Sequence, residues 1–199
     1  MPLLLASTSR YRRELLDRLR LPFHVARPDV DEATLPDEGP AALAVRLARL
    51  KAAAIAAHHP ESWVIGADQV AEVDGQAIGK PGHRDAAIAQ LSAMSGRAIR
   101  FHTALCLLRE TPSADGAAPA SSLHEASDVT TVRFRALSPE EIERYVDAEQ
   151  PFDCAGSFKS EGLGITLFEA IDSQDPTALI GLPLIALSRL LREAGFHLP

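Results

Sequence analysis

Residues 3–16 read Leu3-Leu4-Leu5-Ala6-Ser7-Thr8-Ser9-Arg10-Tyr11-Arg12-Arg13-Glu14-Leu15-Leu16, in which an apolar run, three hydroxyl residues and a helical stripe follow one another. Residues 3–6 show no alternation of polar and apolar side chains, which predicts a strand covered on both faces. The apolar residues after Arg10 recur at helical spacing, so a helix is expected next, capped by Ser9 or Thr8. This order places the free N–H groups of the first helical turn at the end of the strand, as in an anion site.

The first turn of this helix is unusually basic, because it holds Arg10, Arg12 and Arg13. The N-terminus of a helix carries partial positive charge, and each cation there costs about 0.3 kcal/mol or more unless an anion neutralises it. Surface pairing would account for Arg10 with Glu14 and for Arg13 with Asp17. Arg12 has no acid among its helical neighbours, so we interpret it as a phosphate ligand. Arg13 stays open between the two interpretations.

The composition is that of a globular protein, with 46% apolar residues in a chain of 199, enough for one domain or two closely packed lobes. A net charge of −7 without a long basic run argues against nucleic-acid binding and favours a small anionic ligand. No apolar run approaches the roughly 18 residues of a membrane span, and arginines follow the first apolar residues at once, so neither a transmembrane helix nor a signal peptide is expected. Cys106 and Cys154 indicate neither a disulfide framework nor a zinc site, and a reduced, cytoplasmic location is expected.

The rest of the pattern predicts alternating strands and helices in a single domain over residues 1–199. Strands are expected over 21–26, 63–68, 69–73, 76–78, 99–109, 129–136, 165–171 and 179–182. Helices are expected over 40–58 and 84–94 and from Ser138 and Pro183 onward, with a hairpin turn at Asp74-Gly75. Small and polar residues accumulate over about 111–124, which predicts a flexible connector.

Acids and lysines at four places are candidate functional groups. Asp31 and Glu32 follow a strand and are candidate ligands for Mg²⁺ or Mn²⁺, although loop acids are more often solvated. Asp68 is expected at a strand end, where catalytic groups collect in α/β proteins. The following hairpin returns Lys80 to Asp68, either as a functional pair or as a surface pair worth under about 1 kcal/mol. Lys51, beside the apolar stripe of its helix, either extends to water or reaches a phosphate.

A glycine-rich stretch, residues 154–164, is the last conspicuous segment. Its three glycines let the backbone approach a ligand closely. It contains no Gly-Lys-Ser or Gly-Lys-Thr, and Gly162-Leu163-Gly164 is expected to lead into a strand. It is therefore neither a Walker A loop nor a dinucleotide fingerprint.

Together these motifs resemble the Maf family of nucleoside triphosphate pyrophosphatases over nearly the whole chain. The matching segments are Ala6-Ser7-Thr8-Ser9 with Arg12-Arg13-Glu14-Leu15-Leu16, Val30-Asp31-Glu32, Ile65-Gly66-Ala67-Asp68-Gln69, Gly79-Lys80-Pro81 and Gly181-Leu182-Pro183. Residues 154–168, CAGSFKSEGLGITLF, are similar to the family branch that hydrolyses 7-methyl-GTP. The dTTP/UTP branch has Gly-Ala-Tyr and then Gln before Gly-x-Gly, and it has Thr where this chain has Gln69.

The resemblance implies a two-lobed, ITPase-like α/β fold, with an elongated, curved mixed sheet flanked by helices and a central active-site cleft. It implies hydrolysis of 7-methyl-GTP to 7-methyl-GMP and diphosphate, by metal-assisted attack of water at the α phosphate. The implied catalytic residues are Asp68, Lys80 and Glu32, of which Glu32 and Asp68 would hold a divalent metal, Mg²⁺ or Mn²⁺. The implied substrate-binding residues are Ser7, Tyr11, Arg12, Arg13, Lys51, Gln69 and Glu161.

Three of these positions set base preference in the family. Tyr11 stands where this branch often carries Trp and keeps an aromatic face for a cationic base. Glu161 can accept hydrogen bonds from N1–H and the 2-amino group of guanine, and Gln69 either binds another base edge or orients Asp68. Two other functions stay open, a dTTP/UTP-type pyrophosphatase and a non-catalytic nucleotide-binding regulator of cell division. The family implies a possible homodimer, and no nucleic-acid or membrane partner is expected.

Overall fold

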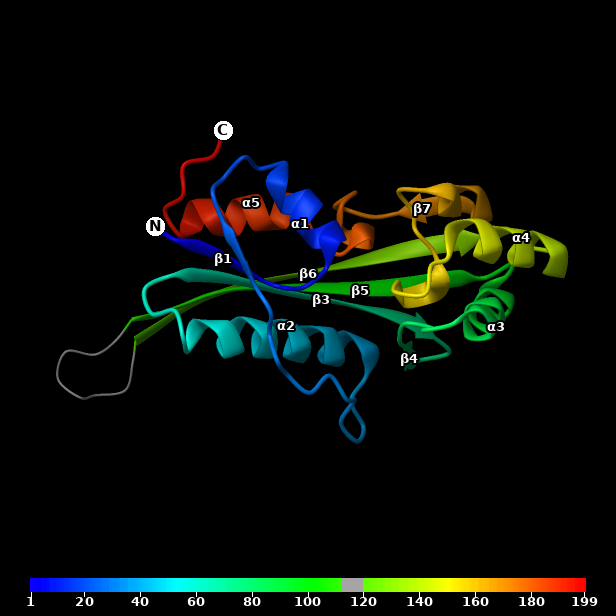
Figure 1. The fold of residues 1–199 in the computed structure, drawn as a ribbon, viewed down its shortest axis with the longest axis horizontal. Helices are drawn as coiled ribbons and strands as arrows, with labels where there is room; N and C mark the ends of the chain where they lie inside the picture. The colour runs from blue at the N-terminus through cyan, green and yellow to red at the C-terminus, as the bar shows by residue number, and fades with distance from the viewer. Residues whose placement is uncertain (112–119) are drawn as a thin grey trace.

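The computed structural model describes residues 1–111 and 120–199, in which strands and helices alternate along the chain (Figure 1). The strands are β1 (Leu3–Ala6), β2 (His24–Ala26), β3 (Trp63–Val73), β4 (Gln76–Ile78), β5 (Ala98–Thr111), β6 (Ala120–Phe134) and β7 (Phe168–Asp172). The α-helices are α1 (Arg10–Asp17), α2 (Pro40–Ala56), α3 (Arg84–Met94), α4 (Pro139–Glu149) and α5 (Leu184–Glu193). Three short 3₁₀ helices are η1 (Ala155–Ser157), η2 (Leu163–Leu167) and η3 (Ala178–Ile180).

One mixed sheet extends through the described residues and has the strand order β2-β1-β3-β5-β6-β7, with β4 paired to β3. β1 runs parallel to both of its neighbours, whereas β3, β5, β6 and β7 pair antiparallel. Long antiparallel strands account for the elongated shape in Figure 1. The predicted α/β fold class with a mixed sheet is confirmed.

Helices cover the sheet on both faces (Figure 1). α2 packs on one face of β1, β3 and β5, while α1 and α5 pack on the other. α3, α4, η2 and η3 contribute to a third core cluster at the far end of the sheet, around Phe101, Phe134 and Phe158. None of the helices in residues 1–111 and 120–199 has the length and apolar composition that crossing a bilayer requires.

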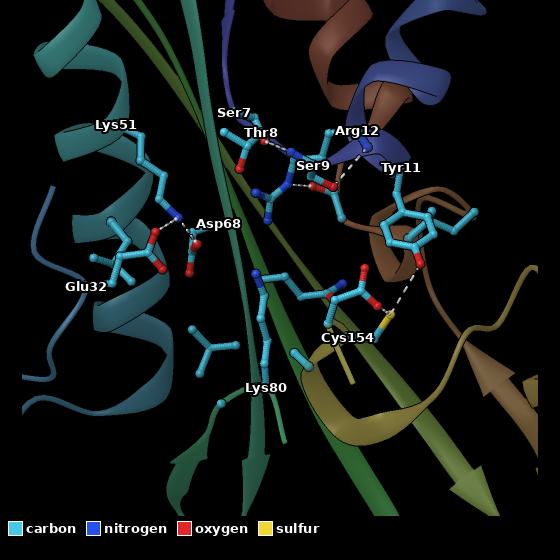
Figure 2. A pocket seen from close by; sticks show the side chains of 18 of the residues that line it. Ser7, Thr8, Ser9, Tyr11, Arg12, Glu32, Lys51, Asp68, Lys80 and Cys154 are labelled. Atoms are coloured by element: carbon cyan, nitrogen blue, oxygen red, sulfur yellow. Dashed lines mark hydrogen bonds and ion pairs between the residues drawn. The ribbon is translucent and has the colours of Figure 1, made fainter. Parts of the chain in front are cut away.

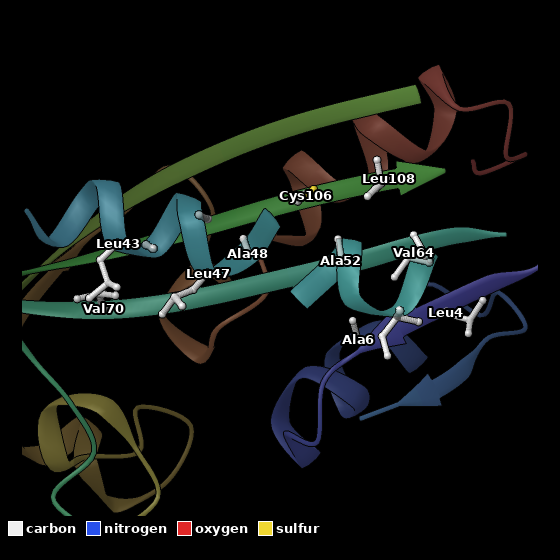
Figure 3. Close-up of a cluster of buried hydrophobic side chains, with 14 residues drawn as sticks. Leu4, Ala6, Leu43, Leu47, Ala48, Ala52, Val64, Val70, Cys106 and Leu108 are labelled. Carbon is white, nitrogen blue, oxygen red and sulfur yellow. The ribbon is translucent and has the colours of Figure 1, made fainter. Parts of the chain in front are cut away.

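The contact between α2 and β3 is exceptionally close, and Gly66 makes it possible. A Cβ placed on Gly66 would lie 2.1 Å from the carbonyl oxygen of Ala48 and 2.9 Å from the Cβ of Ala52. Figure 3 shows Ala48 and Ala52 directed at the strands, with Leu43 and Leu47 extending the contact toward Val70. Alanines on the helix and a glycine on the strand therefore bring the two backbones together two residues before Asp68.

The sequence predicted the local signals of this fold well. Ser9 caps α1, its hydroxyl accepting from the N–H of Arg12, and Ser138 and Glu141 form the expected capping box of α4. The Asp74-Gly75 turn joins β3 to β4, and both of its residues have positive φ.

Three predictions about the later strands were wrong. Residues 165–167 belong to η2, and β7 begins only at Phe168, because the N–H groups of Gly162 and Gly164 both bind the Lys159 carbonyl in a tight turn. The strand predicted over 179–182 is instead η3 and a turn closed by Gly181, whose φ is 115°. The connector predicted over about 111–124 is wrong for residues 120–124, which pair with β5, and its residues 112–119 lie outside the described residues.

Candidate active site

A cavity of about 860 Å³ opens between α1, α2, the β3–β4 hairpin and the 153–161 segment. This volume is typical of small-molecule sites and accommodates a nucleotide. Nine of the ten side chains predicted for the site line it. They are Ser7, Tyr11, Arg12, Glu32, Lys51, Asp68, Gln69, Lys80 and Glu161. Arg13, the tenth, is exposed on α1 and lies outside the cavity lining.

Asp68 lies inside a strand rather than at the strand end that the sequence predicted. β3 continues to Val73, but its parallel neighbour β1 ends at Ala6, opposite Gly66. Asp68 is therefore just beyond the carboxyl end of β1, in the crevice where α/β proteins place their functional groups. The Asp68 side chain is 9% exposed and faces α2, on the side of the sheet that Gly66 also faces.

Lys51 is the charged partner of Asp68. Its ammonium donates to Asp68 Oδ1 at 2.6 Å and lies 2.9 Å from Glu32 Oε1, so one cation joins two carboxylates (Figure 2). Lys51 is buried, with its side chain 6% exposed, whereas Glu32 reaches it from an exposed loop. Of the two alternatives that the sequence left open for Lys51, extension to water is wrong, because the close approach of α2 to β3 turns its stem toward Asp68.

Lys80 points into the same cavity from the loop after β4 (Figure 2). It is exposed, and within the described residues no ion pair joins it to Asp68. The predicted Asp68–Lys80 pair is thus replaced by Asp68–Lys51, and Lys80 is a second cation in the cavity with its ammonium accessible to an anion.

The turn after β1 has the form expected of an anion site. Ser7 is buried and its hydroxyl accepts from the N–H of Ser9 at 3.1 Å, which holds the turn before α1. Arg12 donates from Nε to the Gly181 carbonyl at 2.9 Å, so the guanidinium is oriented by a residue 169 positions away. Desolvation lowers the pKa of Arg12, while Asp68 and Glu32 act in the opposite direction. Charge-assisted hydrogen bonds to a phosphate would offset the cost of desolvating this guanidinium.

Tyr11 lies across the cavity from Lys51 and Glu32 (Figure 2). Both its ring and its hydroxyl contact other side chains. The Arg10 guanidinium lies 4.7 Å from the ring centroid and donates to the hydroxyl at 2.7 Å. Arg10 is thus paired with Tyr11, and its predicted pairing with Glu14 does not occur among the described ion pairs. The Cys154 thiol donates to the same hydroxyl at 3.8 Å (Figure 2). Burial raises the pKa of Tyr11 to about 12.

Gln69 faces away from Asp68, as neighbouring residues in a strand do. Its amide nitrogen donates to the carbonyls of Ala178 at 2.9 Å and Leu179 at 2.8 Å. Thr103 donates to the same Ala178 carbonyl at 3.0 Å. One of the two predicted roles of Gln69 was to orient Asp68, but none of the described hydrogen bonds joins the two side chains. The amide instead holds the turn that presents Gly181 to Arg12.

Glu161 lies at the rim of the cavity and is exposed. Its carboxylate accepts a 3.4 Å hydrogen bond from the Ser160 hydroxyl. Gln90, which the sequence did not single out, joins this side of the site to the Lys80 loop. Its amide donates to the Gly79 carbonyl at 3.1 Å and accepts from the Ser157 hydroxyl at 2.5 Å. A glutamine on an amphipathic helix carries no sequence signal for such a bridge.

The carboxylates of Glu32 and Asp68 suit a hard divalent cation. Both lie on one ammonium, so the two oxygens are at most 5.5 Å apart, the sum of the two distances. Within the described residues there is no cluster of three or more His, Cys, Asp or Glu side chains that could hold a metal alone. Mg²⁺ is commonly held by one or two carboxylates together with substrate phosphates. The donor set fits an ion that completes its coordination with the oxygens of a phosphate-bearing ligand.

Known proteins resemble this chain over nearly its whole length. A family model described as Maf-like protein matches residues 2–194. A Xanthomonas oryzae pv. oryzae protein named 7-methyl-GTP pyrophosphatase is 64% identical over 197 residues, which cover 99% of this chain and 98% of that protein. A Burkholderia pseudomallei protein of the same name is 57% identical over 199 residues, 98% of this chain and 89% of that protein.

Among solved structures, the Staphylococcus aureus Ham1 protein aligns with a TM-score of 0.44 and 16% identity, over 68% of this chain and 73% of that one. The family assignment does not depend on that alignment. It follows from a family model that spans nearly the whole sequence and from full-length relatives at about 60% identity. The chain belongs to the Maf family.

Proposed function

We propose that this protein hydrolyses 7-methyl-GTP to 7-methyl-GMP and diphosphate. The observation that carries the proposal is the contact of the buried Lys51 with the buried Asp68 and the exposed Glu32, at one side of a cavity that also holds Arg12, Ser7 and Lys80. A carboxylate among cations is what hydrolysis of a polyphosphate requires, since one group must take a proton while others stabilise negative charge. The substrate is supported by the name of the full-length relatives.

In the proposed reaction, water attacks the α phosphorus and gives up a proton to the Asp68 carboxylate. The bond between the α phosphorus and the oxygen that bridges it to the β phosphorus breaks, and diphosphate leaves with the electron pair. Lys80, Arg12 and Lys51 stabilise the charge that develops on the leaving group. Ser7 and the N–H groups at the start of α1 bind phosphate oxygens.

A divalent cation, Mg²⁺ or Mn²⁺, is part of the proposal, with Glu32 and Asp68 as its protein ligands. Such an ion, when bound, neutralises phosphate charge and acts as a Lewis acid. Arg13, exposed and outside the cavity lining, contributes to the proposed site only through the long-range field of α1.

For the base, we propose that Tyr11 supplies an aromatic surface and that Glu161 accepts from N1–H and the 2-amino group. N7 methylation gives guanine a positive charge, which strengthens both interactions. Arg10 already lies against the Tyr11 ring, so the base uses the part of the ring that Arg10 leaves accessible. Pyrimidines lack the donor pair that Glu161 binds, which disfavours dTTP and UTP.

Product analysis tests this function. The parent protein is incubated with 7-methyl-GTP, GTP, dTTP and UTP in the presence of Mg²⁺ or Mn²⁺, and products are identified by ³¹P NMR. We expect diphosphate as the primary product, the highest kcat/KM for 7-methyl-GTP, and a loss of at least about 100-fold in Asp68→Asn. Orthophosphate as primary product, or full activity in Asp68→Asn, would overturn the mechanism. A preference for dTTP or UTP would assign the protein to the dTTP/UTP branch of the family. Nucleotide binding without turnover would favour a non-catalytic regulator of cell division.

Two further expectations belong to this proposal. The homodimer implied by the resemblance is tested by sedimentation of the parent protein, and the cytoplasmic location by fractionation of cells that produce it.

A further inference from the structure

The segment that carries Glu161 is a tight loop, residues 159–163, which we call the Glu161 loop. The Lys159 carbonyl accepts from the N–H groups of Gly162 at 3.2 Å and Gly164 at 3.1 Å, which closes the loop and leaves Glu161 at its tip. A Cβ on Gly164 would lie 2.4 Å from that carbonyl oxygen. Since the Glu161 carboxylate is exposed and bonds only its neighbour Ser160 among the described contacts, its position follows from the loop backbone.

Glu149, the last residue of α4, holds this loop from both sides. Its Oε2 accepts from the N–H of Leu163 at 2.9 Å, and its Oε1 lies 3.3 Å from the ammonium of Lys159. Leu163 and Lys159 stand two residues after and two residues before Glu161. One carboxylate thus connects the two ends of the loop that presents Glu161.

The connection is well shielded. The side chains of Lys159 and Glu149 are 11% and 21% exposed, so solvent screens the pair less than a surface ion pair. A Cβ on Gly162 would lie 3.0 Å from Glu149 Oε2, which shows how closely the carboxylate approaches the loop backbone.

Lys159 also fastens the loop to the end of α4. Its ammonium donates to the Glu149 carbonyl at 2.7 Å, where the helix C-terminus favours a cation. The N–H of Lys159 donates to the hydroxyl of Tyr145, also on α4, at 3.1 Å. α4 itself is part of the core at the far end of the sheet, so the loop rests on a rigid element (Figure 1).

We propose that Glu149 is a positioning residue for base selectivity, which acts on the base through Lys159, Leu163 and the Glu161 loop. The proposal rests on the proposed function, in which Glu161 accepts hydrogen bonds from guanine. Hydrogen bonds weaken steeply when distance and angle depart from their optimum. A loop that loses its Glu149 contacts presents Glu161 over a wider range of positions, so discrimination between bases falls while the phosphate end of the cavity is unchanged.

The test compares kcat/KM for 7-methyl-GTP and for GTP in Glu149→Ala, Glu149→Gln and a matched control, Glu143→Ala. Glu143 is an exposed acid on the same helix, and its carboxylate lies 3.9 Å from the guanidinium of Arg84. We expect Glu149→Ala to lower the ratio of kcat/KM for 7-methyl-GTP to kcat/KM for GTP about tenfold. GTP has the same N1–H and 2-amino donors without the positive charge, so its own kcat/KM should fall by a smaller factor, about threefold. Glu149→Gln keeps an acceptor for the N–H of Leu163, so its 7-methyl-GTP to GTP ratio should lie between those of the parent and Glu149→Ala. The ratio in Glu143→Ala should match that of the parent.

A double variant separates positioning from general damage. In a Glu161→Ala background, Glu149→Ala should lower the ratio no further, because its effect passes through Glu161. Lys159→Met removes the ammonium and leaves Glu149 in place, and it should also lower the 7-methyl-GTP to GTP ratio. This variant tests the proposal even if Glu149→Ala folds poorly. An unchanged ratio, an equal loss for both nucleotides, or additive losses in the double variant would overturn the proposal.

The parent measured alone tests the proposed function separately. A parent that prefers another nucleotide over 7-methyl-GTP overturns the proposed substrate. The variants are then scored by the ratio of that preferred nucleotide to the next best one, and the same outcomes support or overturn the role of Glu149.

Discussion

Lys51 donates a 2.6 Å hydrogen bond to Asp68 from the helix face that touches Gly66, two residues earlier on the same strand. The ion pair and the glycine contact are two parts of one arrangement. Ala48 and Ala52, which flank Lys51 in the sequence, let α2 pack closely on β3. The Lys51 side chain then extends into the cavity, where it meets Asp68. Packing between two elements thereby determines which cation meets the carboxylate that we propose to be catalytic.

Lys51→Met should destabilise the protein and reduce turnover together. The variant leaves the buried Asp68 carboxylate without its cation, and breaking a buried pair in this way costs about 3 kcal/mol. Urea unfolding measures the loss. Arg49→Met is the matched control, because Arg49 lies on the same helix and its pair with Glu125 is solvent-exposed, with an expected change under about 1 kcal/mol. Equal losses in both variants would contradict the special status of Lys51.

Gly66→Ala should lower the free energy of unfolding by about 1–3 kcal/mol, because the added methyl meets the Ala48 carbonyl and α2 must move away from β3. The same displacement withdraws Lys51 from Asp68, so kcat/KM should fall as well. Urea unfolding and steady-state kinetics measure the two effects. Gly79→Ala is the control for stability, since a Cβ there has no atom within 4 Å. A Gly66→Ala variant as stable as the parent would show that the contact is not tight in solution.

Gln69→Glu should raise the KM for the nucleotide about tenfold. The new carboxylate would face the carbonyl oxygens of Ala178 and Leu179 that now accept from the amide, and repulsion would displace the turn before Gly181. Arg12, which Gly181 orients, would lose its position with that turn. Gln76→Glu, at an exposed site on β4, should leave KM unchanged. Parent-like KM in Gln69→Glu would mean that the turn is held by other contacts.

Cys154 should resist alkylation although it lines the cavity. Burial raises the pKa of the Cys154 thiol to about 12. A raised pKa disfavours the thiolate, the reactive form, so at pH 8 about 0.01% is ionised, against roughly a quarter of a free thiol. Iodoacetamide labelling, followed by mass spectrometry, should be about 1000-fold slower than for free cysteine and should rise about tenfold per pH unit from pH 8 to 11. Urea-unfolded protein is the control, and fast labelling of the folded protein would contradict the burial.

The sequence alone determined the parts of this protein that depend on neighbours in the chain. The apolar run of β1, the Ser9 cap, the basic first turn of α1 and the turn at Asp74-Gly75 all arise from contacts within a few residues. The family motifs also identified nine side chains that line one cavity. Such features can be predicted from the sequence because helical and strand periodicity and helix capping involve residues only a few positions apart.

Only the tertiary structure decided which distant residues the site side chains contact. Lys51 meets Asp68 across 17 residues, Gln69 meets Ala178 across 109 and Arg12 meets Gly181 across 169. Periodicity predicts that a residue lies on a given face, but it does not predict which element packs against that face or how closely. The strand end expected at Asp68 and the strand expected after Gly162 were wrong for the same reason. In both places a backbone contact with a distant or folded-back segment, β5 or the Lys159 carbonyl, outweighs the local pattern.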